Sequence, residues 1–138
     1  MNIKLPHRKF GLVLAFSKKP DASKYSHVEF VFPNNKSLGS FGDTGTVDYT
    51  TREHDDSHCW VFVKVEGYHT QPRMNEFREM CWKEVGKKHL KNGIFPQLWK
   101  SDKWKSSELC MRMLGHEKFK VSAQKAFDIV IKNGGVVI

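Results

Sequence analysis

The sequence contains few cysteines, and it lacks long apolar runs and a recognisable targeting segment. Its three cysteines are odd in number and widely spaced over 138 residues, which fits reduced thiols better than a disulfide framework. No apolar run approaches the roughly 20 residues that span a bilayer, and the first residues lack the apolar segment of a signal peptide. We therefore expect a cytoplasmic protein without a membrane span.

The sequence also lacks internal repeats, low-complexity tracts and linkers. Its 138 residues have the length of one ordinary domain, and 39% of them are hydrophobic. A chain of this size and composition buries a core without disulfides, so disorder is excluded as the main state. We expect a single domain over residues 1–138.

Acidic residues are in the minority. The chain has 15 Asp and Glu against 23 Lys and Arg, which gives a net charge of +8. Such an excess fits either an anionic partner or a solvated, soluble surface. No recognised nucleic-acid motif accompanies the charge, so we do not expect a nucleic-acid partner.

No motif for a metal or a cofactor is present. The segment 54–58 combines two imidazoles with two carboxylates, but its spacing matches no recognised metal-binding pattern. Gly39, Gly42 and Gly45 are expected in turns, and no phosphate-loop pattern surrounds them. We therefore expect neither a metal nor a cofactor.

Short apolar and alternating segments fill the first half of the chain and predict strands. These strands are expected over residues 9–17, 27–32, 37–41, 46–50 and 59–65. In the second of them, Val28 and Phe30 point to one side of the sheet. His27 and Glu29 point to the other.

The second half of the chain changes to three- and four-residue spacing of apolar residues, which predicts helices over 73–87, 107–114 and 123–132. Ser122 is expected to cap the last helix, with Ile131 among its inward residues, and Gly86 is expected near the end of the first. Residues 88–104 are expected to be irregular. The order of strands before helices predicts an α+β fold, with an antiparallel sheet of about five strands packed against helices.

Two polar residues far apart in the sequence suggest chemistry. His27 stands at the entrance of a predicted strand, and Ser106 stands where a predicted helix begins. A base on a strand that faces a nucleophile at a helix N-terminus is the arrangement of cysteine amidases and peptidases. The backbone N–H groups of the helix start stabilise an oxyanion, and Glu29 lies on the same side as His27 and can orient its ring. The alternatives are a histidine that only caps a strand and a serine that only caps a helix.

The cysteines themselves are expected to be structural. Cys59 on a strand and Cys81 on a helix face are core positions by default. Cys110 lies one turn after Ser106 on the apolar side and is also expected in the core. The alternative is that Cys110 is the working thiol.

At these residues the chain resembles a known family. It shows Ser26-His27-Val28-Glu29 on a strand, followed by Trp104-Lys105-Ser106-Ser107-Glu108 and then Leu114-Gly115. This is similar to the circularly permuted papain-like amidases of the NlpC superfamily, especially a small group from phages and bacteria. The resemblance implies a permuted papain-like fold. It also implies hydrolysis of an amide, isopeptide or thioester bond, with Ser106, His27 and Glu29 as the catalytic residues.

The chain departs from that family at two positions. The family's nucleophilic cysteine aligns with Ser106, and a tyrosine thought to assist the oxyanion aligns with His89. We interpret Ser106 as an inactivating change made by engineering, with a natural replacement as the alternative, because a serine hydroxyl is a far weaker acid than a thiol.

The resemblance also suggests what the protein acts on. His89, Trp104 and Ser107 are the expected substrate-binding residues, and the alternative for Trp104 is a place in the core. The expected substrate is a peptide, a protein or another amide, in the host cytoplasm if a phage encodes the protein. The alternative function is a catalytically dead papain-like module that binds a protein or an anionic partner.

Overall fold

The computed structural model describes residues 11–67, 70–89 and 103–138, and its strands form one sheet. The longer strands, of five or six residues, are β1 (Val13–Lys18), β2 (His27–Val31), β3 (Lys36–Phe41), β4 (Thr46–Thr51) and β5 (Cys59–Lys64). The two-residue strands are β6 (Lys88–His89), β7 (Lys103–Trp104) and β8 (Val136–Val137). The order across the sheet is β7-β6-β4-β3-β2-β1-β5-β8. Neighbouring strands are antiparallel except for the β6–β7 pair, which is parallel.

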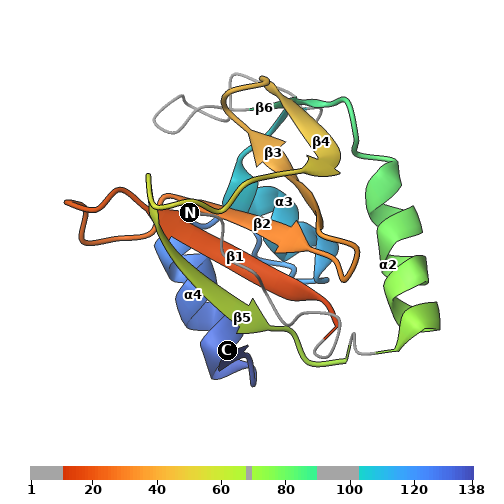
Figure 1. Ribbon diagram of the computed structural model, residues 1–138. Helices are drawn as coiled ribbons and strands as arrows, with labels where there is room; N and C mark the ends of the chain where they lie inside the picture. The colour runs from red at the N-terminus through yellow and green to blue at the C-terminus, as the bar shows by residue number, and fades with distance from the viewer. Residues whose placement is uncertain (1–10, 68–69, 90–102) are drawn as a thin grey trace.

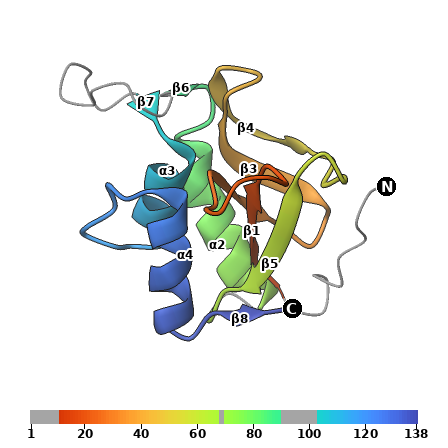
Figure 2. The same cartoon turned by 90° about the vertical axis from the view of Figure 1, so that its left-hand side faces the viewer.

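The helices of the described chain are α2 (Gln71–Trp82), α3 (Ser106–Met113) and α4 (Ala123–Lys132). Figures 1 and 2 show α3 and α4 side by side on one face of the sheet, with α2 beside them. The predicted α+β class, with a largely antiparallel sheet packed against helices, is confirmed. None of the helices in these ranges combines the length and the apolar character needed to cross a membrane.

Strand β2 is buried on both of its faces. Val28 and Phe30 belong to the large core that α3 and α4 complete, and both are fully buried. Val31, on the opposite face, packs in a smaller cluster with Val13, Ala15 and Phe62. Glu29 alternates with Val28 and Phe30, so it lies on the face of the smaller cluster, away from the helices. This confirms the predicted alternation.

The first helix is shorter than the 73–87 predicted from spacing, because it ends at Trp82. Gly86 takes a positive φ of 93°, and its N–H donates to the Val47 carbonyl at 2.7 Å. The Val47 N–H donates in turn to the Lys87 carbonyl at 2.7 Å. These two bonds to strand β4 draw the chain into the sheet, so Lys88 and His89 form strand β6. The prediction of irregular structure from residue 88 is therefore wrong at both of its ends, where β6 and β7 pair.

Several side-chain predictions are corrected by position within an element. Cys59 is exposed rather than in the core, because it pairs with Lys18 at the last position of the β1–β5 ladder. Ile131 is 37% exposed because Val130, its neighbour in sequence, occupies the buried side of α4. Gly39 lies within strand β3 rather than in a turn. Cys81 and Cys110 are fully buried, as predicted.

Candidate functional site

The site begins with two side chains of strand β2. His27 and Glu29 are two residues apart on a strand, so they project from the same face. The His27 Nε2 lies 3.0 Å from Glu29 Oε1, and Glu29 is only 1% exposed. Gly39, on neighbouring strand β3, leaves room for this carboxylate, since a Cβ at position 39 would lie 3.1 Å from the Glu29 Cβ. His27 and Glu29 therefore share one face of the strand, as the alternation predicts, and their side chains are in contact.

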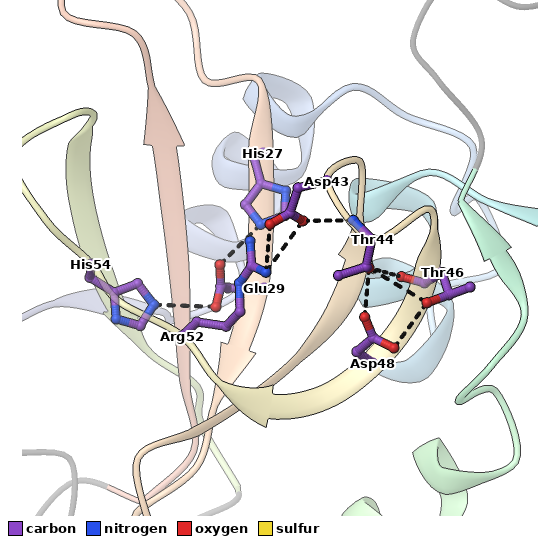
Figure 3. A network of polar contacts seen from close by, with 8 residues as sticks. All are labelled: His27, Glu29, Asp43, Thr44, Thr46, Asp48, Arg52 and His54. Carbon is purple, nitrogen blue, oxygen red and sulfur yellow. Dashed lines mark hydrogen bonds and ion pairs between the residues drawn. The ribbon is translucent and has the colours of Figure 1, made fainter.

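A second imidazole binds the same carboxylate. His54, in the loop that follows β4, places its Nε2 3.2 Å from Glu29 Oε2. Its ring packs edge-on against Trp60 at 4.6 Å and against Phe62 at 5.6 Å between centroids, and the residue is 6% exposed. Figure 3 shows His27 and His54 approaching Glu29 from different sides. Sequence reasoning missed this role and considered His54 only as part of a metal-like segment.

Glu29 is ionised at neutral pH. Burial alone raises the pKa of this carboxyl, but the hydrogen bonds from His27 and His54, together with their charges, outweigh burial and hold the pKa at about 2. A carboxylate only accepts hydrogen bonds, so both Nε2 atoms must carry the proton in this arrangement. In a neutral His27 ring, Nδ1 is then the nitrogen with a lone pair, available to take a proton from another group.

A polar cavity of about 340 Å³ adjoins His27 and Glu29. The Arg52 guanidinium lies at its wall, 4.0 Å above the Phe41 ring centroid, with Nη1 3.0 Å from Asp43 Oδ2. This ion pair holds the pKa of Asp43 below its usual value, mainly through the Arg52 hydrogen bond. The cavity therefore offers a substrate both carboxylates and cationic donors beside the histidine.

Helix α3 begins without a side-chain cap. Lys105 occupies the N-cap position and its side chain accepts no bond from the helix, whereas Ser106 at the first helical position is 7% exposed. The N–H groups of a first turn have no carbonyl partner within their own helix. The next residue, Ser107, donates its hydroxyl to the Val121 carbonyl at 2.6 Å, which ties the helix start to the segment before α4.

Glu108 adds a carboxyl to the first turn of α3. It is 6% exposed, and burial raises its pKa, partly offset by the charges of Lys105 and Lys120. Its Oε2 lies 3.9 Å from the Lys105 Nζ. A carboxylate at this position interacts favourably with the helix dipole, so Glu108 supports the helix start although no side chain caps it.

The fold brings the start of α3 to the end of the sheet at which β2 begins. The Cys110 Sγ lies 3.7 Å from the Val28 carbonyl, and Ser106 precedes Cys110 by about one turn, roughly 6 Å along the axis. Strand pairing connects the two regions as well. Thr46 pairs with Phe41 on one side and with Lys88 on the other, and Lys88 pairs with Lys103, which lies just before α3. The Phe41 ring is in turn 5.7 Å from the His27 ring.

His27 and Ser106 are not in direct contact in this structure. No hydrogen bond joins these two described side chains, and Ser106 is not among the residues that line the cavity of about 340 Å³. His27 Nε2 is already bonded to Glu29, which leaves Nδ1 to approach position 106. The structure therefore brings His27 and Glu29 together and packs α3 against β2, but it does not bring Ser106 to His27, because His27 and Glu29 project from the face of β2 away from the helices.

Two predicted substrate-binding residues are placed only by their backbones. His89 and Trp104 face each other across the parallel β6–β7 pair, directly before the start of α3. Their side chains lie outside the described residues, as does all of segment 90–102. Ser107, the third predicted binding residue, has its hydroxyl bonded to Val121.

The His and Asp side chains of segment 54–58 do not converge on a common point that could hold a metal ion. Asp55 accepts from the Ser57 backbone N–H at 3.0 Å, while His54 turns inward to Glu29. Across residues 11–67, 70–89 and 103–138, no group of three or more His, Cys, Asp or Glu side chains is placed to hold a metal ion.

Comparison with known proteins adds no relative. No family model matches the chain, and neither a curated protein nor a solved structure matches it.

Proposed function

We propose that the protein has the architecture of a thiol-dependent hydrolase, in which residue 106 is the nucleophile position, His27 the general base and Glu29 the residue that orients it. The observation that carries the proposal is the His27–Glu29 pair, 3.0 Å apart, on strand β2, against whose other face the uncapped helix α3 packs. Base, orienting carboxylate and free backbone N–H groups are the three parts that such a nucleophile requires.

With cysteine at position 106, the proposed reaction has two stages, acylation of the thiol and hydrolysis of the acyl thioester. His27 Nδ1 takes the thiol proton, and the thiolate sulfur bonds to the substrate carbonyl carbon while the carbonyl electrons move to oxygen. N–H groups of the first turn of α3 stabilise that oxyanion. The C–N bond then breaks, and the leaving amine takes the proton from the His27 imidazolium. Water, deprotonated by His27, attacks the acyl thioester and releases the acid and the thiolate.

Serine at position 106 makes this form weakly reactive or inert. A serine hydroxyl ionises at far higher pH than a thiol, and no described hydrogen bond joins it to His27. We propose peptides, isopeptide-linked proteins and other amides as substrates, since the cavity beside His27 offers both carboxylates and cationic donors. Three free cysteines favour a reducing compartment, so we propose a cytoplasmic site of action.

The test restores the thiol. Ser106→Cys is treated with iodoacetamide, and labelling is followed at each cysteine by peptide mass spectrometry. Position 106 is expected to react at least about tenfold faster than exposed Cys59 at about pH 6.5. His27→Ala in the same background should remove the advantage, whereas His116→Ala, which alters a histidine outside the cavity, should not. Labelling no faster than at Cys59 would contradict the proposal.

A second candidate function is favoured by the serine itself and by the charge. A buried serine at a helix start, on a chain of net charge +8, fits a catalytically dead module that binds a protein or an anionic partner. This candidate predicts an unreactive thiol after Ser106→Cys. It also predicts affinity for an acidic polymer such as heparin that falls steeply as salt rises.

A further inference from the structure

We infer that His54 is a positioning residue of the proposed site, which holds Glu29 in the orientation that presents its other oxygen to His27. The inference rests on the proposed function and extends it to a residue that sequence motifs do not include. Each histidine hydrogen-bonds one oxygen of the Glu29 carboxylate, His27 at Oε1 and His54 at Oε2.

The carboxylate needs both partners because it is buried. Glu29 is 1% exposed, so an oxygen without a protein donor has little access to water. A buried charged oxygen left without a hydrogen bond carries a large desolvation penalty. Without His54, the carboxyl would take up a proton or rotate toward a new donor, and either change would loosen its hold on His27.

His54 is itself held rigidly. Its ring meets Trp60 at an interplanar angle of 85° and Phe62 at 89°, so two aromatic residues of β5 fix its plane. The residue is 6% exposed, and its Nε2 is directed at Glu29. His54 therefore acts on the reaction through the carboxylate, and the structure gives it no place in the cavity wall.

The consequence for His27 is a fixed tautomer. A carboxylate at Nε2 keeps the proton on that nitrogen and stabilises the imidazolium that forms during catalysis. The other titratable or charged groups around the cavity come from the β3–β4 turn and the loop before β5: Asp43, Arg52, Glu53, Asp55 and His58. A substitution at position 54 alters none of these residues.

The test compares side chains that do and do not reach Glu29, in the Ser106→Cys background. His54→Gln keeps a donor at a similar reach, His54→Asn carries a shorter amide, and His54→Leu carries no donor. The alkylation rate at position 106 is measured as a function of pH and compared with that of Ser106→Cys alone. Near neutral pH, the rate should stay within about twofold in the Gln variant and fall about tenfold or more in the Asn and Leu variants. His116→Gln is the matched control, because this histidine follows α3 and does not line the cavity beside His27.

A second readout does not depend on reactivity. Nitrogen NMR shifts of the histidine rings in the Ser106 protein report which nitrogen carries the proton. Both His27 and His54 should be protonated at Nε2, and His27 should lose that fixed tautomer in His54→Leu but keep it in His54→Gln. Circular dichroism checks that each variant is folded, and His54→Asn replaces the Leu variant if that one does not fold.

The outcomes separate this inference from the proposed function. Unchanged alkylation profiles and an unchanged His27 tautomer in the Leu and Asn variants would overturn the role of His54. The proposed function would survive that result if His27→Ala still abolished fast labelling. If Ser106→Cys were unreactive from the outset, the proposed function would fail, and the tautomer measurement would still decide whether His54 positions Glu29.

Discussion

Helices α3 and α4 begin in opposite ways. In α4, the exposed Ser122 caps the helix, and its Oγ accepts from the Lys125 N–H at 3.1 Å. In α3, the N-cap residue is Lys105, which makes no such bond, and the first three helical residues are all buried. Helix α2 resembles α4, since Thr70 accepts from the Arg73 N–H at 3.4 Å.

The difference indicates what each helix start is for. A capping hydroxyl satisfies a backbone N–H locally, which stabilises the helix and occupies the donor. An uncapped and buried start leaves donors directed at whatever lies beyond it, and this is the common anion-binding arrangement of helix N-termini. Among the helices that the structure describes, α3 packs against strand β2, which carries the His27–Glu29 pair on its other face.

The largest predicted effect is the loss of stability in acid. It arises from Glu29, the buried carboxylate that binds His27. The pKa of Glu29 in the folded protein is about 2, below its ordinary value of 4.5. Its ionised form therefore stabilises the fold above about pH 4.5, and this contribution of roughly 3 kcal/mol is lost as the pH falls toward 2. Urea unfolding at a series of pH values should show the loss in the parent protein and a flatter profile in Glu29→Gln. Equal profiles would contradict the assignment.

The sharpest comparison places a cysteine at the same helical position in both helices. Ser106 and Ala123 are each the first helical residue, and they are 7% and 5% exposed. Ser106→Cys should react with iodoacetamide roughly 10 to 50 times faster than Ala123→Cys at about pH 6.5, because only the first occupies the proposed nucleophile position that His27 serves. Similar rates would mean that a helix start alone accounts for the reactivity.

Sequence reasoning reached part of this arrangement. Strand alternation was enough to place His27 and Glu29 on one face, and a serine before an apolar period was enough to identify the α4 cap. His54 could not be found in this way. It is separated from Glu29 by 25 positions, and its inward orientation depends on the packing of Trp60 and Phe62.

The early end of α2 escaped prediction for a similar reason. Its spacing continues past Trp82, but the bonds between Gly86, Val47 and Lys87 pull the chain into the sheet. Such contacts between distant segments override local periodicity. Local patterns therefore identified the strands and the cap of α4, while the N-cap of α3 at Lys105 and the residues brought in by loops required the fold.

Removing the cap of α4 should affect stability alone. Ser122→Ala is expected to lower the free energy of unfolding by about 1 kcal/mol, since the Lys125 N–H loses its acceptor. Chemical denaturation measures this change. In the Ser106→Cys background the labelling rate at position 106 should be unaffected, and a slower rate would show that the two helix starts are coupled.

Adding a cap to α3 should give the smallest change in stability and the opposite sign. Lys105→Ser is expected to raise the free energy of unfolding by about 0.5 kcal/mol, because a hydroxyl would accept from the first turn. It should also slow labelling at position 106 after Ser106→Cys, since the new cap competes for the same N–H groups. Lys105→Gln, which removes the charge but caps poorly, is the control. Faster labelling in Lys105→Ser would contradict the role given to the uncapped start.

The most direct measurement of the central claim is the pKa of a thiol at position 106. Thiolate absorbance of Ser106→Cys is titrated against pH, with the unmodified protein as the blank for Cys59, Cys81 and Cys110. We predict a midpoint below about 7.5, and a return to about 8.5 or above when His27→Ala is added. A midpoint near 8.5 that His27→Ala leaves unchanged would contradict the pairing of this strand histidine with the start of α3.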